Sequence, residues 1–209
     1  MRQRRRLSSA ANGVAPIPEA SVDQHGLVVR AREGDRHAFA ELIRASGARL
    51  DATARLILRD PDLAQDAVQE TLIRAWRSLP GLRDPASFDH WLHSLVANAC
   101  IDLVRKRRRR VIEVELAPIH DGPTLDGAAL IADRDQLDRV LARLEPEARA
   151  VVVLHFYLDL PLPRVADMLG IPIGTAKSRL HRSLGAMRSA LAIEEVASAQ
   201  QRSLGGPAT

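Results

Sequence analysis

The chain has 209 residues, a net charge of +4, few aromatic residues and a single cysteine, Cys100. This length allows one large domain or two small ones, and a lone cysteine excludes a disulfide framework and a cysteine-rich zinc site. No apolar run approaches the 18 residues of a membrane span, and no apolar segment follows the basic start, so we expect a soluble, unexported protein without membrane insertion.

Residues 1–24 mix arginine, serine, alanine, glycine and proline without periodicity, which predicts a disordered basic tail. Apolar residues recur at helical spacing from His25 to Arg59, which predicts two helices in this segment. Because aromatic residues are scarce throughout, the core should be packed by leucine, valine, isoleucine and alanine, and this also favours helices.

The next predicted helix begins at Asp60, which can cap it, has Pro61 in its first turn, and ends near Leu79. Carboxylates spaced by four residues form a ridge on one exposed side with two glutamines nearby: Asp62, Asp66, Glu70, Gln65 and Gln69. Acids near a helix N-terminus stabilise the helix through its dipole, which is one interpretation of the ridge. Glu70 lies too far along the helix for this effect to explain it. A protein-docking face is the other interpretation, and the spacing of the residues alone does not favour either one.

A long amphipathic helix is predicted from Phe88 to about Arg108, after a loop at residues 82–87. Its polar side carries His90, His93, Asn98, Asp102 and Arg105. Histidines three residues apart could suggest a metal, but no third ligand lies at a useful spacing, so we expect exposed histidines. The helix continues into six consecutive cations, residues 105–110, which are either simply solvated or, beside Asn98 and aromatic neighbours, bind nucleic acid.

Residues 110–132 lose this periodicity and contain prolines and glycines, so we predict a flexible linker. A second helical domain is expected at residues 133–193, followed by a tail at 194–209. Within it, two short helices meet at a tight turn: Gly170 closes the first, and the Thr175 hydroxyl can cap the second.

The second of these helices has an apolar stripe and a basic face. The predicted buried stripe is Ala176, Leu180, Leu184, Met187 and Leu191. The other face carries Lys177, Ser178, His181 and Arg182, with Arg179 at its flank. Such a helix-turn-helix suits insertion into a DNA major groove, whereas the simpler interpretation is a surface helical hairpin with a solvated basic face.

Positive charge is concentrated in three blocks that contain no acidic residue: residues 1–10, 105–110 and 174–191, with charges of +4, +6 and +4. Blocks of this kind are expected where a protein meets a polyanion. The rest of the chain is acidic overall, which argues against a protein that simply coats nucleic acid.

Three segments, in this order, resemble an extracytoplasmic-function (group IV) bacterial sigma factor: LAQDAVQETLIRAW, FDHWLHSLVANACIDLVRKRR and LEPEARAVVVLHFYLDLPLPRVADMLGIPIGTAKSRLHRSL. The resemblance covers about residues 27–108 and 133–191. It implies an all-α protein of two small helical domains, a sigma region 2 bundle (25–109) and a sigma region 4 helix-turn-helix (133–193), joined by a flexible linker. It also implies a transcription initiation factor that binds RNA polymerase core and directs promoter recognition, melting the −10 element and reading the −35 element, with no catalytic residue, metal or cofactor.

The resemblance assigns three sets of contact residues. The set expected to dock on the β′ clamp helices of the polymerase is Asp62, Gln65, Asp66, Gln69, Glu70 and Arg74. The set expected to capture −10 DNA is Arg83, Ser87, Phe88, Asn98 and Arg105. The set expected to contact −35 DNA is Thr175, Lys177, Ser178, Arg179, His181 and Arg182. The implied partners also include the polymerase β subunit and an anti-sigma factor, and the implied location is the bacterial cytoplasm, with nucleoid association when active.

One departure from the family pattern lies in the turn motif, where Pro163 and Arg164 replace the usual acidic pair before the Val165–Ala166 step. Any contact made by those acids is therefore absent, which leaves Arg164 free for a phosphate. The position of His181 varies in the family, so its base preference stays open.

Three other functional classes fit part of the pattern. A DNA-binding regulator would use the same helix-turn-helix without polymerase and would bind duplex DNA tightly on its own. A metal-dependent nucleic-acid enzyme would need more ligands than the carboxylate ridge supplies, because only Asp62 and Asp66 readily reach one ion. An adaptor or anti-sigma protein has no need of two separated cationic faces.

Overall fold

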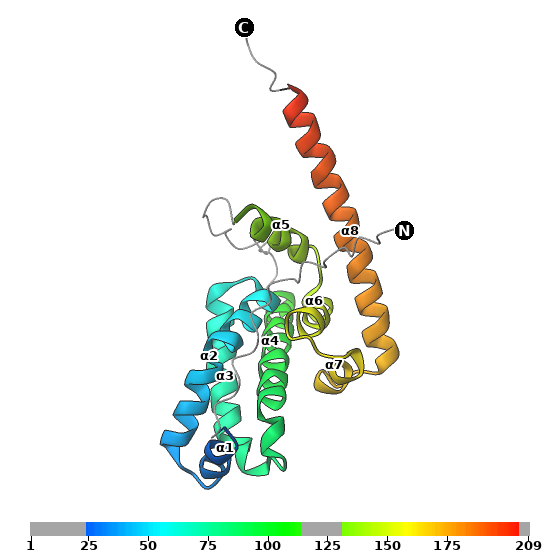
Figure 1. The fold of residues 1–209 in the computed structure, drawn as a ribbon. Coiled ribbons are helices and arrows are strands. Elements are labelled where there is room, and N and C mark those ends of the chain that lie inside the picture. Colours follow the sequence, from blue (N-terminus) through cyan, green and yellow to red (C-terminus); the bar gives the residue numbers. More distant parts are fainter. Residues whose placement is uncertain (1–23, 114–130, 205–209) are drawn as a thin grey trace, which may run out of the picture.

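The computed structural model describes residues 24–113 and 131–204, and every element within these ranges is helical (Figure 1). The longer helices are α1 (Gln24–Arg32), α2 (Arg36–Leu58), α3 (Pro61–Ser78), α4 (Phe88–Glu113), α5 (Ile131–Ala142), α6 (Pro146–Val152), α7 (Leu162–Met168) and α8 (Ile173–Leu204). Short helical turns are η1 (Leu79–Gly81), η2 (Pro85–Ser87) and the π-helical η3 (Val153–Tyr157). The all-α prediction is confirmed. The predicted N-terminal tail and most of the predicted linker lie outside the described residues.

The first four helices form one bundle, in which α2, α3 and α4 run lengthwise side by side (Figure 1). We call α1–α4 the bundle and α5–α8 the C-terminal half. Leu50 and Ile57 of α2 meet Leu92 and Val96 of α4 in the bundle core, all of them fully buried. Trp76 packs edge-on against Phe39, with ring centroids 5.1 Å apart.

Helix α3 begins as its sequence predicts. The Asp60 carboxylate accepts hydrogen bonds from the backbone N–H groups of Asp62 and Leu63, at 3.1 and 3.0 Å, and Pro61 is the first helical residue. Its fully buried side consists of small residues at helical spacing: Ala64, Ala67, Thr71 and Ala75. Small side chains let α3 lie close to α2 and α4, while Ile73, which the apolar pattern places inside, is 47% exposed.

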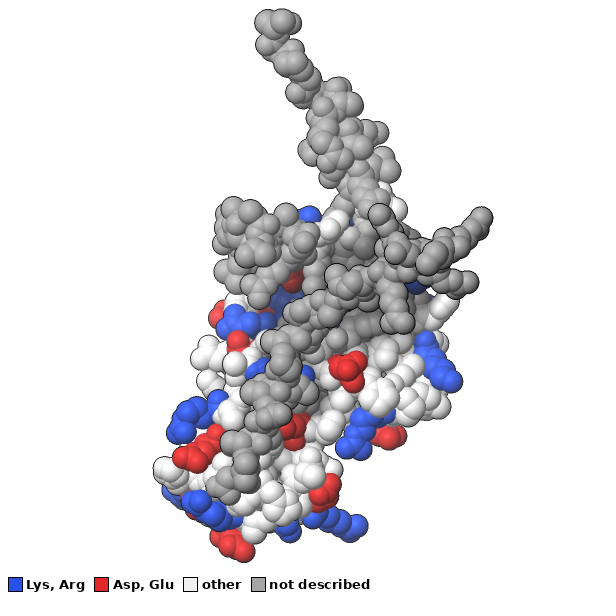
Figure 2. Space-filling model, in the orientation of Figure 1, with Lys and Arg blue, Asp and Glu red and all other residues white. Residues whose placement is uncertain are grey.

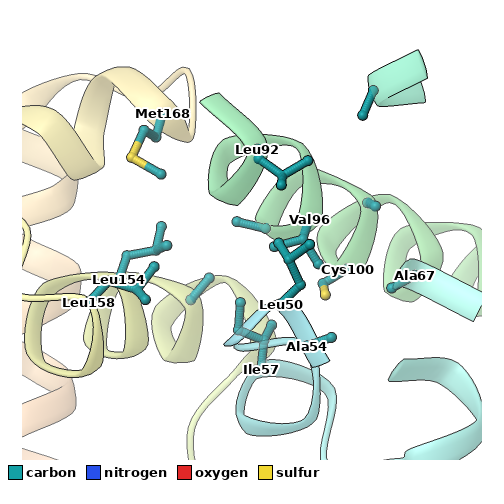
Figure 3. Packing of buried hydrophobic residues seen from close by; sticks show 14 of the residues in the cluster. Leu50, Ala54, Ile57, Ala67, Leu92, Val96, Cys100, Leu154, Leu158 and Met168 are labelled. Atoms are coloured by element: carbon teal, nitrogen blue, oxygen red, sulfur yellow. The ribbon is translucent and has the colours of Figure 1, made fainter. Parts of the chain in front are cut away.

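The C-terminal half packs on the bundle through a shared apolar core. Leu154 and Leu158 after α6, together with Met168 of α7, face Leu92 and Val96 of α4 (Figure 3). One continuous cluster of buried residues therefore runs from the bundle into the C-terminal half.

The turn between α7 and α8 forms where it is predicted. Gly170 adopts a left-handed conformation (φ +62), and the Ile171 N–H donates to the Ala166 carbonyl at 3.0 Å, which closes α7. Helix α8 begins at Ile173, slightly earlier than predicted, because the Pro172 carbonyl already accepts the Thr175 N–H. Thr175 therefore lies inside the first turn and is not the helix cap.

Helix α8 differs from its prediction in two ways. As far as residue 192, where side-chain burial is described, its buried positions are Ala176, Ser183 and Ala190, spaced by seven, whereas Leu191 is 36% exposed. The helix also continues to Leu204, where a tail was predicted from residue 194. The reason is compositional, since residues 193–204 contain no glycine or proline and are rich in alanine, glutamate and glutamine.

None of the helices in the described ranges has both the length and the apolar content needed to cross a lipid bilayer.

Candidate protein-docking and DNA-binding faces

The carboxylate ridge of α3 faces solvent. Asp62, Gln65, Asp66 and Gln69 are exposed, and the Glu70 side chain is 46% exposed. The opposite side of the same helix is the buried row of small residues, so the ridge is held on a rigid support. Within the described residues, the side chains of Asp62 and Asp66 have no ion-pair partner, which leaves both carboxylates available to another molecule.

Arg74, predicted as a docking residue, lies in an ion-pair network that joins two helices. Its Nε donates to Glu70 Oε1 at 2.8 Å, and its Nη1 donates to Asp102 Oδ2 of α4 at 3.0 Å. These bonds, first that to Glu70 and then that to Asp102, raise the pKa of Arg74 above its usual value. The guanidinium therefore holds Glu70 in place on the ridge and ties α3 to α4.

Sequence reasoning missed Ile73, which lies three residues after Glu70 and seven after Asp66 and is 47% exposed. An exposed large apolar side chain amid charged neighbours is a frequent centre of a protein interface. The helical spacing of the apolar residues predicts that Ile73 lies on the buried side, so this pattern could not identify it as a surface residue. We call Asp62, Gln65, Asp66, Gln69, Glu70 and Ile73 the α3 ridge.

The residues predicted to capture −10 DNA are distributed over the length of α4 and the loop before it, and they do not form one cluster. Arg83 and Ser87 precede the helix, and the Ser87 hydroxyl donates to Asp84 Oδ2 at 2.7 Å, which contributes most to lowering the pKa of Asp84. Arg105 lies 17 residues after Phe88, or roughly 25 Å along the helix at 1.5 Å per residue. Such a set suits an extended strand better than a single base.

The assignment of Phe88 to DNA binding is wrong. Its side chain is fully buried as the first residue of α4, and its ring lies 5.9 Å from that of Trp91. An aromatic ring at this position completes the bundle core and cannot stack on a base. Trp91 is only half-buried, so it is the aromatic residue nearer to solvent here.

Asn98 and Arg105 of α4 are in contact with the C-terminal half. Asn98 Nδ2 donates to the Met168 carbonyl at 3.0 Å, and Arg105 Nε lies 3.7 Å from Glu147 Oε1. Both side chains retain some exposure, since Asn98 is half-buried and Arg105 is 54% exposed.

The basic face of α8 points into solvent. Lys177, Ser178, His181 and Arg182 are exposed, while Thr175 and Arg179 are half-buried. Arg182 Nε donates to the Ser178 carbonyl one turn earlier, at 3.2 Å, so its guanidinium lies along the helix surface. Over the face seen in Figure 2, basic and acidic side chains are interspersed.

His93 corrects the expectation of two exposed histidines. His90 is exposed, but His93 is only 6% exposed, and its Nδ1 lies 2.7 Å from the Asp89 carbonyl. Burial lowers the pKa of His93 below its usual value. Cys100 is also buried, which raises the pKa of its thiol to about 12. Within the described ranges, no three histidine, cysteine, aspartate or glutamate side chains come together in a group that could hold a metal ion.

Comparison with known proteins identifies the family. The family model described as Sigma-70 region 2 matches residues 42–110, and that described as Sigma-70, region 4 matches residues 134–187. The ECF RNA polymerase sigma factor SigM of Mycobacterium tuberculosis is 36% identical over 151 residues, 72% of this chain and 75% of that protein. SigW of Bacillus subtilis is 26% identical over 176 residues, 78% of this chain and 94% of that protein.

Two solved structures share this fold. The sigma factor RpoE of Bartonella quintana, crystallised with the anti-sigma factor NepR, has a TM-score of 0.60 and 25% identity, over 74% of this chain and 97% of that one. CnrH, in complex with the cytosolic domain of CnrY, has a TM-score of 0.58 and 24% identity, over 81% of this chain and 97% of that one. The chain belongs to the ECF group of the sigma-70 family of RNA polymerase sigma factors.

Proposed function

We propose that this sigma factor binds RNA polymerase core through the α3 ridge, which docks on the β′ clamp helices, and that its C-terminal half also contacts the β subunit. The observation that carries the proposal is the exposure of the ridge on a helix whose other side is fixed in the bundle core. Charged and apolar groups presented together on a rigid helix suit a specific protein interface.

Promoter DNA is bound at two separate sites on the protein. The basic face of α8 enters the −35 major groove, with Lys177, Ser178, His181 and Arg182 toward the bases and Arg179 toward the backbone. Arg83, Asn98 and Arg105 along α4 hold the melted −10 strand. Extruding a base costs a few kcal/mol, which stacking and cationic contacts with the single strand offset. Binding alone performs both tasks, so we assign no catalytic residue, metal or cofactor.

Regulation by an anti-sigma factor is part of the proposal. Its support is the RpoE structure, in which the partner is named as an anti-sigma factor and which matches this chain over 97% of its length. The protein would then work in the bacterial cytoplasm, free or held by its inhibitor, and would associate with the nucleoid when active.

The ridge is tested by reversing two of its charges with Asp66→Arg and Glu70→Arg. We expect the double variant to lose binding to purified core polymerase in a pull-down, because like charges then face the docking site. Circular dichroism should show that the helices remain folded, since both side chains are at the surface.

The matched control reverses two carboxylates on α2, with Glu41→Arg and Asp51→Arg. Glu41 lies near His37 and Asp51 pairs with Arg55, each four positions away, whereas on α3 only Glu70 has such a partner. The control therefore has the same charge change on a different helix. Undiminished core binding by the α3 variant, or equal loss by the control, would reject the assignment of the ridge.

A further inference from the structure

Ion pairs between cations of the bundle and acids of the C-terminal half join the two halves. Arg59 lies 3.5 Å from Asp138 of α5, Arg105 lies 3.7 Å from Glu147 of α6, and Arg108 donates to Glu145, which precedes α6. In each pair the bundle supplies the cation and the C-terminal half supplies the acid.

Two further bonds link side chains of one half to the backbone of the other. Asn98 of α4 donates to the Met168 carbonyl at the end of α7, at 3.0 Å. Arg149 of α6, which is 6% exposed, donates from Nη1 to the Ile57 carbonyl at the end of α2, at 2.7 Å. Together with the shared apolar core (Figure 3), these bonds define one packing arrangement of the two halves.

The contacts fall on groups that the proposed function gives to DNA. Asn98 and Arg105 are expected to hold the melted strand, and Arg108 belongs to the cationic block that continues α4. A carboxylate binds a guanidinium through the same charge-assisted hydrogen bonds that a phosphate oxygen would make. Glu145 and Glu147 therefore stand at positions that strand phosphates would take.

We propose that the free protein is closed, with α6 and α7 covering the strand-binding side of α4 and with Glu145 and Glu147 as substitutes for DNA phosphates. This inference rests on the function proposed for α4. Opening must come before capture of the −10 strand, so the intrinsic affinity of α4 for single-stranded DNA is reduced by the fraction of molecules that are open. Surface ion pairs are individually weak and screened by salt, so the closed state is a bias that a ligand can overcome.

The first test neutralises the two acids in the full-length chain with Glu145→Gln and Glu147→Gln. The probe is a fluorescein-labelled, mixed-sequence single-stranded DNA of about 12 nucleotides, followed by fluorescence anisotropy. We expect binding to tighten about threefold to tenfold, because the open fraction rises. The control, Glu33→Gln with Glu41→Gln, makes the same change in net charge at the end of α1 and on α2, away from the interface.

An unchanged affinity of the Glu145→Gln, Glu147→Gln variant would overturn the closed state. So would an equal gain in the control, because the effect would then be one of net charge alone.

The second test holds the two halves together without altering the proposed DNA contacts. Arg59→Cys and Asp138→Cys are bridged by a cleavable bis-maleimide, and the buried Cys100 is not expected to compete for the reagent. We expect the bridged protein to bind the probe about tenfold more weakly than the unbridged variant, and cleavage to restore binding. Equal binding before and after cleavage would overturn the proposal.

The closed state and the proposed function fail in different ways. If neither test changes strand binding while the α3 ridge variant loses core polymerase, the closed state is rejected and the polymerase assignment stands. If the full-length chain and all its variants leave the probe unbound at low salt, the role of α4 in strand capture is rejected as well.

Discussion

At the scale of single residues, His93 is the ionisable side chain on which stability should depend most clearly. It is 6% exposed, and desolvation, the largest cause, lowers its pKa from the ordinary 6.5. The folded protein therefore disfavours the protonated form, while the unfolded chain takes up a proton near pH 6.5. The contribution of neutral His93 to the free energy of unfolding is fully present above that pH, and it is lost as the pH falls toward the lowered pKa of the folded state.

We predict that the free energy of unfolding decreases between about pH 7.5 and about pH 5.5, and that His93→Gln reduces this decrease. Urea denaturation at the two pH values measures it. His90→Gln is the control, because His90 is exposed on the preceding turn and should leave the dependence intact. If His93→Gln keeps the full pH dependence of the wild type, the buried imidazole is not its source.

Phe88 fits the apolar stripe of α4, so its burial follows from helical spacing, and only the family resemblance placed it against DNA. Burial of His93 could not be predicted from spacing, because His93 lies beside that stripe on a helix that packs against both α2 and α3. A helical repeat identifies one apolar stripe, but a helix packed on several sides also buries residues beside that stripe. The structure tolerates burial of His93 because its Nδ1 forms a hydrogen bond with the Asp89 carbonyl.

At the scale of elements, the limits of α3 were more predictable from the sequence than its buried side. Asp60 and Pro61 fix its start by local hydrogen bonding and backbone geometry, which depend on adjacent residues only. Which side is buried depends on the neighbouring helices, and close packing selected the small residues. The larger Ile73 was left outside.

This exposure leads to a prediction for Ile73→Ala. If Ile73 becomes buried against core polymerase, the substitution should weaken binding by roughly 1–2 kcal/mol while barely changing the thermal stability of the free protein. Competition binding to core polymerase measures the loss. Glu41→Ala on α2 is the control, since Glu41 lies on the bundle outside the α3 ridge. Wild-type affinity for Ile73→Ala would remove that residue from the interface.

For α8, the prediction concerns the two arginines of its first turns. Arg182 is exposed on the basic face, whereas Arg179 is half-buried at its flank. Arg182→Ala should cost roughly 1–3 kcal/mol on cognate −35 duplex if the guanidinium forms a bidentate contact with guanine, and little on scrambled duplex. Arg179→Ala should weaken both duplexes alike, as a phosphate contact would. Equal losses on the two duplexes for Arg182→Ala would make it a phosphate contact instead.

At the scale of the whole molecule, the family and the two helical modules were accessible from sequence because each motif is local. The contact between the two modules could not be predicted from the sequence. It depends on residues distant in the chain, such as Arg149 and Ile57, and on charges with more than one possible partner. For the cationic block at residues 105–110 the sequence offers solvent or nucleic acid as the partner, yet Arg105 and Arg108 lie beside carboxylates of the same chain. Electrostatic complementarity alone does not distinguish an internal partner from an external one.

The length of α8 has a mechanical consequence. Its 32 residues make a rod of roughly 48 Å, which leaves the corner after Gly170 and projects past the other helices (Figure 1). A rotation of one degree at that corner displaces the far tip by roughly 0.8 Å, since the arc grows with the radius. A spin label or fluorophore near Leu204 would therefore report small rotations of α8 as larger displacements than a probe placed at the corner after Gly170.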